Sequence, residues 1–343
     1  NTVYYYLIPY GLFQLFIAPF VNSIGFKRTA MWGFFTFALG AVIILCAGNI
    51  FTFALGRIVQ GIGGSSVYLM TKMIIQRKYK EGQVNIAFSI LESFAMATPG
   101  IAPLLGACIL QFFPWQGLFY FILIYVAFAT FMVSRMLDNK EIQKPPRLTK
   151  ILSNYKELIL NFNYLRFLCV ILFAISPTIF SLSNIPFILH ESFGLSIIIY
   201  SICMSLTICG SFFGTIFSRI ANENGFKNKA IKLAIFIMIF SGSLLAMATF
   251  LDLHSILFFM LAVIAIFFSF GVIFPNAIAD SFKQVKNKTG SEVALLGCFQ
   301  VTGGAILNFI LSRFLTNPEI LLPLLFIISG IAIGLFYKFD NKS

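Results

Sequence analysis

The sequence predicts an all-α protein that crosses a membrane many times, and three observations carry that prediction. Hydrophobic residues make up 59% of the 343 residues and charged residues only 10%, whereas a soluble domain is about 25% charged. The apolar residues fall into runs of roughly 20, the length that a helix needs to cross a bilayer. The runs are apolar all round, which favours helices over a barrel. Soluble enzymes, disordered regions and secreted disulfide scaffolds are therefore excluded.

Eleven such runs follow one another and are predicted as transmembrane helices. They lie near residues 3–24, 29–49, 52–75, 84–110, 116–136, 166–189, 195–219, 230–250, 254–279, 291–313 and 319–338. A polar stretch divides them into five and six, which predicts an N-terminal bundle over 1–137, a cytoplasmic central loop over 138–165 and a C-terminal bundle over 166–343. Within that loop, Ile151–Leu160 is expected to form a short helix along the inner membrane surface.

The basic residues predict the orientation of these helices. All but two of the 24 Lys and Arg residues lie at alternate ends of the runs, and the exceptions are Arg57 and Arg313. Because Lys and Arg collect on the cytoplasmic side of a membrane, residue 1 is expected outside and Ser343 inside. The net charge of +12 is therefore interpreted as a sign of orientation, and no nucleic-acid partner is predicted.

A short repeat links the two predicted bundles. Gly25-Phe26-Lys27-Arg28 follows the first run, and Gly225-Phe226-Lys227-Asn228-Lys229 follows the seventh, 200 residues later. Both stand in a short inner turn, which predicts two pseudo-symmetric six-helix bundles. The first bundle lacks one helix on this interpretation, and that helix is expected to precede Asn1.

Three motifs resemble the major facilitator superfamily, and within it the bacterial Bcr/CflA-like drug:proton antiporters. The turn at Ala18–Arg28 resembles the family's G-x-x-x-D-R-x-G-R-[RK] motif, but Asn22 replaces the acid, and Ser23 and Phe26 replace the arginines. The run Arg57-Ile58-Val59-Gln60-Gly61-Ile62-Gly63 is similar to the family's R-x-x-Q-G-x-G element. Ala102-Pro103-Leu104-Leu105-Gly106-Ala107 is similar to the antiporter signature G-P-x-x-G-G, with Ala at two Gly positions.

This resemblance covers the chain from the family's second helix to its twelfth. It implies a bacterial inner-membrane carrier with a cytoplasmic C-terminus, which exports small amphiphilic or drug-like compounds in exchange for protons by alternating access. It also implies a coupling acid in the family's first helix, which precedes this sequence. Two alternatives stay open: a proton-coupled uptake symporter for a nutrient or siderophore, and a truncated membrane remnant that transports nothing.

Six polar residues within the apolar runs are predicted to line a substrate or proton path. Arg57 in hydrocarbon costs about 2.5–3.5 kcal/mol, so it either faces a polar interior beside Gln60 or snorkels to the outer headgroups. Glu92 is either a proton-coupling carboxylate or a structural pair for a basic residue, because burial raises a carboxyl pKa. Asn184, Asn276 and Gln300 complete the set.

A second group of residues is predicted to serve conformational change. Asn22, Gly25, Lys27 and Arg28 form an inner gate, or simply carry positive-inside charge. Small residues allow close helix approach, and prolines bend helices. The positions concerned are Gly61, Gly63, Pro99, Pro103 and Gly106.

No cofactor and no metal site are predicted, because the six cysteines form no C-x-x-C pair and the chain has two histidines. The runs also hold no cluster of His, Asp and Glu, so an enzyme is not expected. The expected partners are the lipid bilayer, a small-molecule substrate and protons, and the protein is expected to be a monomer.

Overall fold

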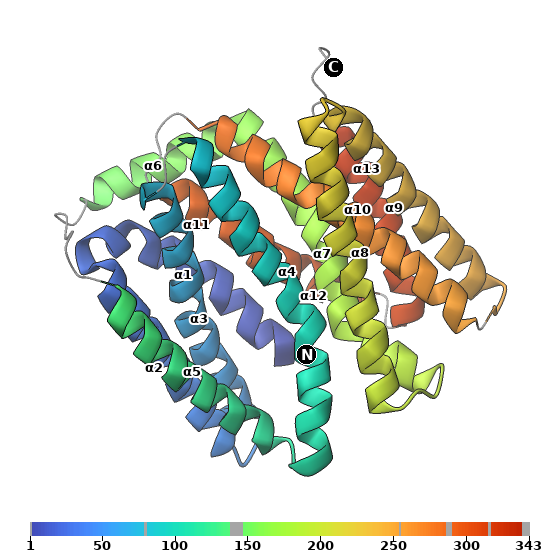
Figure 1. Ribbon diagram of the computed structural model, residues 1–343, viewed down its shortest axis with the longest axis horizontal. Helices are drawn as coiled ribbons and strands as arrows, with labels where there is room; N and C mark the ends of the chain where they lie inside the picture. The colour runs from blue at the N-terminus through green and yellow to red at the C-terminus, as the bar shows by residue number, and fades with distance from the viewer. Residues whose placement is uncertain are drawn as a thin grey trace. The chain divides into compact units, whose positions relative to one another are not determined.

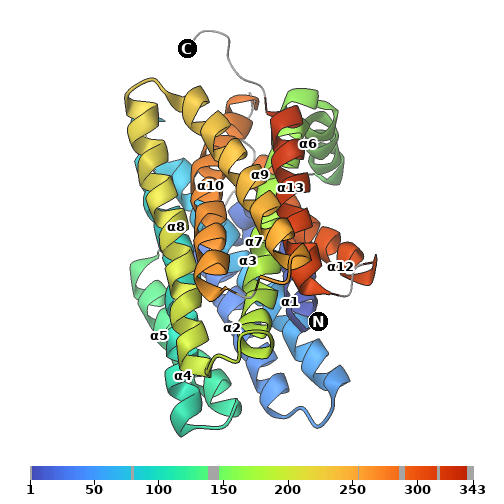
Figure 2. The same ribbon diagram turned by 90° about the vertical axis from the view of Figure 1, so that its right-hand side faces the viewer.

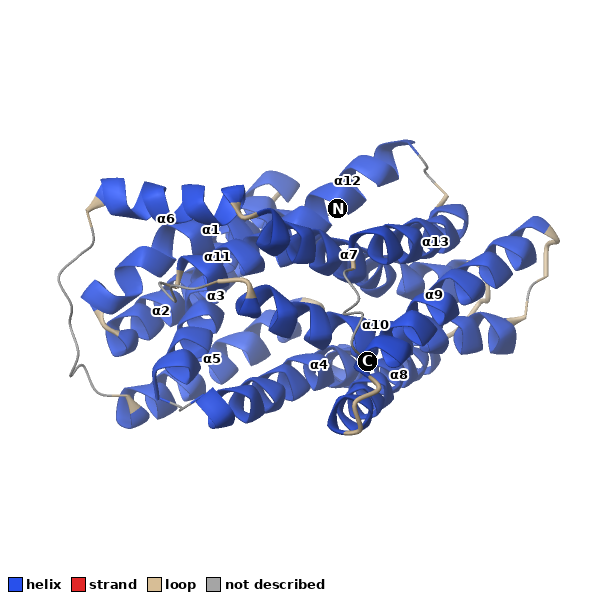
Figure 3. Ribbon diagram, turned by 90° about the horizontal axis from the view of Figure 1, so that it is seen from above, coloured by secondary structure: helices blue, strands red, loops and turns tan. Residues whose placement is uncertain are grey.

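The structure is a computed structural model that describes residues 2–78, 81–137, 147–253, 255–285, 290–314 and 317–337. Inside its helices, the side chains of residues 22, 76–77, 81–90, 92–93, 96–97, 99, 312 and 314 are not described. All secondary structure in the described part of the chain is helical (Figure 3).

The helices follow one another with short connections (Figure 1). Their bounds are α1 Thr2–Ile24, α2 Phe26–Leu45, α3 Ile50–Lys78, α4 Glu81–Phe112, α5 Gln116–Met136, α6 Leu148–Leu160, α7 Phe162–Glu191, α8 Ile197–Glu223, α9 Lys227–Phe250, α10 Ile256–Lys283, α11 Ser291–Cys298, the π-helical turn η1 Phe299–Gly303, α12 Gly304–Phe314 and α13 Pro318–Phe336. Every predicted transmembrane run falls on one of these helices, with α11, η1 and α12 forming one run.

Ten candidate membrane spans are found among the described residues by length and apolar composition. The remaining predicted run falls on α4, whose described apolar stretch is Gly100–Phe112. The predicted surface helix is α6, and it begins three residues before the predicted start. The all-helical membrane fold predicted from the sequence is confirmed.

Two compact units make up the chain, and each draws on both sides of the predicted central loop. Unit 1 contains Asn1–Ile90, Ile109–Phe162 and Val285–Ile306. Unit 2 contains Leu91–Cys108, Asn163–Gln284 and Leu307–Ser343. The predicted division at 137 and 166 rests on the long polar stretch between them and stays a prediction.

Unit 1 is built on α3, which packs against α1, α2 and α11. Glycines bring α2 and α3 close together: a methyl group at Gly63 would lie 2.6 Å from the Gly33 carbonyl oxygen. Asn49 stands just before the first residue of α3 and caps that helix by accepting a hydrogen bond of 2.9 Å from the Thr52 amide. The α2–α3 pair visible in Figure 1 therefore depends on small side chains.

Unit 2 is built on α10, which packs against α8 and α9, and α9 in turn packs against α13 (Figure 2). Close approach again uses glycines: a methyl group at Gly271 would overlap the Ser211 carbonyl oxygen on α8. From α4, Gly100 lies against Ile208, and its carbonyl oxygen accepts a hydrogen bond from the Ser205 hydroxyl.

Both repeat turns contain a glycine with positive φ. Gly25 has φ of 92° and Gly225 has φ of 76°, a region that side chains other than glycine rarely adopt. Each precedes a new helix, α2 or α9. The repeat also extends to Asn22 and Asn222, three residues before each glycine.

Candidate functional site

Arg57 of α3 is held by one side chain from α1 and one from its own helix. Its Cζ atom lies 5.0 Å from the centroid of the Tyr6 ring, which is a cation–π contact. Its Nη1 atom donates a hydrogen bond of 3.1 Å to Oε1 of Gln60. The structure thus brings together the two residues that the sequence singled out in α3, and it adds Tyr6.

Part of the hydrogen-bonding capacity of this pair is unused. Nε of Arg57 and Nε2 of Gln60 are both buried, and neither has a hydrogen-bond partner among the described residues. A buried donor left unsatisfied costs about 1–3 kcal/mol. The pair therefore offers two donors to a water molecule or to a bound compound that carries an acceptor.

A column of aromatic rings continues from Arg57 along α1 and α3. The ring centroids of Tyr6 and Tyr10 are 5.6 Å apart, and those of Tyr10 and Tyr68 are 6.5 Å apart. At the far end, Nζ of Lys72 lies 4.3 Å from the centroid of the Tyr68 ring. Three tyrosines thus stand between two cations.

The column crosses much of the depth of a membrane. Arg57 and Lys72 are fifteen positions apart on one helix, and at 1.5 Å per residue their Cα atoms are separated by about 22 Å along its axis. The hydrocarbon core of a bilayer is about 30 Å thick. All three tyrosines are half-buried. The sequence analysis did not single out these tyrosines, although the spacings Tyr6–Tyr10 and Tyr68–Lys72 each place two residues on one helix face.

Small residues determine how α1 can meet α3 here. A methyl group at Gly61 would overlap the Tyr6 carbonyl oxygen and lie 3.2 Å from the Tyr10 amide nitrogen. Gly61 therefore leaves the space in which Tyr6 and Tyr10 of α1 approach α3. Gly63 faces α2 instead.

A set of polar contacts, the α1–η1 seam, joins α1 to α11 and η1. The Thr302 hydroxyl donates a hydrogen bond of 2.9 Å to the Ile8 carbonyl oxygen, and Thr302 sits against Gly11. In the reciprocal contact, the Gln14 amide lies against Gly297. Each helix thus supplies one glycine and one polar side chain.

Gln300, a predicted path residue, lies in η1 and is buried. Its Oε1 atom has no hydrogen-bond partner within the described part of the chain, and neither does Nε2 of the buried Gln14. The seam therefore holds one free acceptor and one free donor. A π-helical turn often marks a functional position in a helix, and no local feature of the sequence indicates this one.

The turn predicted as an inner gate is ordered by hydrogen bonds to backbone oxygens, from the Gly25 amide to the Val21 carbonyl and from Thr29 to the Gly25 carbonyl. The Gly25 carbonyl oxygen accepts a hydrogen bond of 2.9 Å from the Thr29 hydroxyl, while Lys27 is half-buried and Arg28 exposed. The roles predicted for Lys27 and Arg28 stay predictions. The Asn22, Glu92 and Pro99 side chains lie outside the described residues. α4 continues as a helix through Pro103 and Gly106, and both are half-buried.

Two predicted path residues in unit 2 use their polar atoms within the bundle. Asn184 donates a hydrogen bond of 2.9 Å to the Phe180 carbonyl oxygen on its own helix. Asn276 donates 2.8 Å bonds to the Ser218 hydroxyl and the Val272 carbonyl oxygen, and it accepts a 3.0 Å bond from Asn222. Asn276 therefore joins α10 to α8, and its place on a transport path stays a prediction.

An ion cluster near Asn276 was missed by the sequence analysis. Nζ of Lys227 lies 2.6 Å from both carboxylate oxygens of Asp280, which also accepts a 2.7 Å hydrogen bond from the Tyr337 hydroxyl. Lys283 adds a weaker contact of 3.2 Å. This cluster fixes the repeat turn of Lys227 to α10 and to the end of α13. The available signal was Asp280 itself, an acid at the end of an apolar run.

Comparison with known proteins gives the family of the chain. Residues 2–308 match the family model described as Major Facilitator Superfamily. Multidrug resistance protein D of Escherichia coli K12 is 23% identical over 330 residues, covering 96% of this chain and 83% of that protein. The bicyclomycin resistance protein homolog of Haemophilus influenzae is 24% identical over 331 residues, covering 95% and 81%.

The fold also matches a solved structure. The xylose transporter XylE from Escherichia coli, in a partially occluded inward-open conformation, aligns with a TM-score of 0.73 at 10% identity, covering 98% of this chain and 86% of that one. At this identity the likeness concerns the fold alone. The helical architecture, the α3 motif of Arg57 and the family match agree: the chain is a membrane transporter rather than an enzyme, and it belongs to the Major Facilitator Superfamily.

Proposed function

We propose that the protein exports small amphiphilic or drug-like compounds in exchange for protons by alternating access. The observation that carries this proposal is the Arg57–Tyr6–Gln60 cluster at one end of the tyrosine column. Aromatic faces bind apolar and cationic bodies, and the two unused donors bind an acceptor group. The names of the relatives, multidrug resistance protein D and a bicyclomycin resistance protein homolog, support this class of cargo.

Arg57 is the residue proposed to couple cargo to protons. An intramembrane guanidinium stays charged, so it favours the ionised form of any carboxylate that approaches it and opposes a second cation. Movement of Arg57 between Gln60 and another partner would therefore change the proton affinity of the path. The setting proposed for this exchange is a bacterial inner membrane, with the basic ends of the helices on the cytoplasmic side.

Transport in everted membrane vesicles that contain the protein tests the proposal. A proton gradient is imposed, and the accumulation of ethidium and the accompanying release of protons are both measured. We expect ethidium uptake that dissipates the gradient, and we expect Arg57→Ala to abolish it at equal expression. Arg313→Ala is the matched control, because Arg313 is exposed and its guanidinium lies over the Phe309 ring of its own helix.

Three results would overturn the proposal. Accumulation in the opposite direction would indicate an uptake symporter. Failure of a panel of lipophilic cations and neutral amphiphiles to move protons would remove drug export. Full transport by Arg57→Ala would remove Arg57 from the coupling step.

A further inference from the structure

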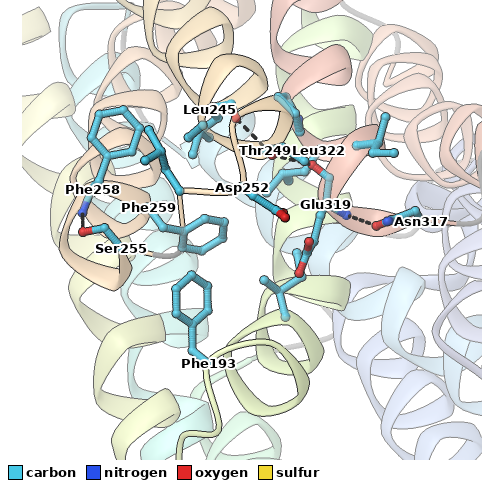
Figure 4. A pocket seen from close by; sticks show the side chains of 15 residues that line it. Phe193, Leu245, Thr249, Asp252, Ser255, Phe258, Phe259, Asn317, Glu319 and Leu322 are labelled. Carbon is cyan, nitrogen blue, oxygen red and sulfur yellow. Dashed lines mark hydrogen bonds between the residues drawn. The ribbon is translucent and has the colours of Figure 1, made fainter.

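Unit 2 contains a cavity that no part of the proposed transport path uses. Its volume is about 230 Å³, and it lies where the ends of α7, α9, α10 and α13 meet (Figure 4). By the charge pattern of the sequence, these are the predicted outer ends of the helices. Drug-sized ligands occupy cavities of about 300–1,000 Å³, so this one suits a smaller molecule.

Two carboxylates line the cavity. Asp252 follows the last turn of α9, and Glu319 lies in the first turn of α13. The described residues that line the cavity include no Lys or Arg, in a chain with 24 basic and only 12 acidic residues. The described part of the wall therefore carries acidic side chains in a protein that is basic as a whole.

The Glu319 carboxylate and the backbone of Asp252 are each held by hydrogen bonds nearby. The Glu319 carboxylate accepts a hydrogen bond from the Ser192 hydroxyl, and its amide donates a 2.9 Å bond to Asn317. Asp252 has φ of 55° and is the one residue other than glycine with positive φ among the described residues. The turn that holds it is closed by a 2.9 Å hydrogen bond from the Leu253 amide to the Ala248 carbonyl oxygen.

Aromatic rings form another part of the wall. Phe193, Phe258 and Phe259 line the cavity, and the ring centroids of Phe193 and Phe259 are 5.7 Å apart. In the view of Figure 4, the rings of Phe193 and Phe259 lie beside the carboxylates of Asp252 and Glu319. An organic cation satisfies both kinds of wall, since carboxylates bind its charge and ring faces attract it and cover its apolar body.

We propose that this cavity binds a small organic cation, an ammonium group on a compact apolar or aromatic body. The cavity and the Arg57 column share no residue, and this proposal does not depend on the proposed export function. A metal ion is the less suitable occupant, because no group of three or more His, Cys, Asp and Glu side chains is found together in the described residues.

Binding of 4-fluorobenzyltrimethylammonium to the purified protein in lipid nanodiscs tests the proposal, with ¹⁹F NMR as the readout. We expect saturable binding that is weakened about tenfold in the double variant Asp252→Asn/Glu319→Gln, because the two substitutions remove both charges that attract the cation. Asn tolerates positive φ, so the first substitution preserves the turn. Glu223→Gln is the matched control, since Glu223 is exposed on α8 and lies outside the cavity.

A second pair of measurements separates charge recognition from apolar binding. The neutral analogue 4-fluorobenzyl alcohol should bind at least tenfold more weakly than the cation. Phe259→Leu should weaken binding of the cation but leave binding of the alcohol unchanged, because it retains an apolar side chain and removes the ring. Thermal unfolding of each variant checks that it is folded.

Three outcomes would overturn the proposal, none of which depends on transport. Equal binding of the cation and the alcohol would indicate a plain apolar cavity. Unchanged affinity in the double carboxylate variant would place the bound probe elsewhere. Displacement of the probe by micromolar Ca²⁺ would make the site a metal site.

Discussion

Thr302 and Ile8 are joined by a hydrogen bond of 2.9 Å across 294 positions of the sequence. The bond links η1 to α1, and Gly11 provides the space in which Thr302 fits. Ile8 belongs to the first segment of unit 1 and Thr302 to its last segment, so this contact holds the two segments together.

Gly11→Ala should disrupt this seam. Its methyl group would come within 2.8 Å of the Thr302 backbone nitrogen, which cannot rotate away, so α1 and η1 must separate. Overpacking of this kind costs about 1–3 kcal/mol. We expect a lower midpoint of thermal unfolding in detergent.

Two glycines serve as controls for that prediction. Gly297→Ala meets the far end of the flexible Gln14 side chain and should cost less, and Gly48→Ala meets nothing within 4 Å and should be neutral. Equal effects of all three substitutions would contradict the packing argument.

Tyr6→Leu should remove the cation–π contact with Arg57. A contact of this type contributes about 0.5–2 kcal/mol, and Tyr6→Phe should preserve it because the ring remains. A double-mutant cycle with Arg57→Met, measured by thermal unfolding, isolates the coupling between the two side chains. Tyr120→Leu on the exposed face of α5 should show no coupling to Arg57. A coupling near zero for Tyr6 would show that the ring merely lies near Arg57.

Asp280→Asn should weaken the cluster at the end of unit 2. The substitution keeps the shape but removes the charge that Lys227 and Tyr337 bind at 2.6 and 2.7 Å. Hydrogen bonds to charged groups contribute about 1.5–3 kcal/mol, so a drop in stability of about that size is expected. Glu223→Gln breaks an exposed pair with Arg219 and should cost well under 1 kcal/mol. If both variants lose the same stability, the burial of Asp280 has no special effect.

Tyr155→Phe should change how stability depends on alkaline pH. Tyr155 lies on α6, outside the candidate spans, and its hydroxyl donates a 2.8 Å hydrogen bond to the Leu15 carbonyl oxygen. Burial raises the pKa of this hydroxyl above its usual value. The protonated Tyr155 hydroxyl therefore contributes fully to the stability of the folded state below pH of about 10. This stabilisation is lost as the pH rises through the raised folded-state pKa.

The midpoint of unfolding of both proteins, recorded from pH 8 upward, checks this expectation. The unsubstituted protein should lose stability more steeply than Tyr155→Phe above pH of about 10. Tyr125→Phe on the exposed face of α5 is the control and should follow the unsubstituted protein. Parallel curves for Tyr155→Phe and the unsubstituted protein would contradict the assignment.

The spans were predictable because the bilayer imposes their length. The apolar run Gln116–Met136 has the same bounds in the sequence prediction and in the structure. The polar residues that flank such a run mark where the helix begins and ends. The π-helical turn Phe299–Gly303 was not predictable, because its sequence has no feature that distinguishes it from ordinary helix.

The site was predictable only where its partners are neighbours in sequence. Arg57 and Gln60 lie three positions apart on one helix, so their pairing follows from helix geometry. The partnership of Arg57 with Tyr6 depends on how α1 is rotated against α3, which Gly61 and the packing of unit 1 decide. The Lys227–Asp280 pair likewise joins residues 53 positions apart, through the packing of α8, α9 and α10.

The segments of unit 1 lie far apart in the sequence, and this affects the order in which the protein can be assembled. These segments run from Asn1–Ile90 to Val285–Ile306, so a ribosome has synthesised most of the chain before Thr302 emerges. Until then, the Ile8 carbonyl oxygen lacks its hydrogen bond from Thr302, and Gly11 lacks the neighbour that packs against it. Packing of the first helices is therefore complete only after the tenth predicted run, 291–313, has been made.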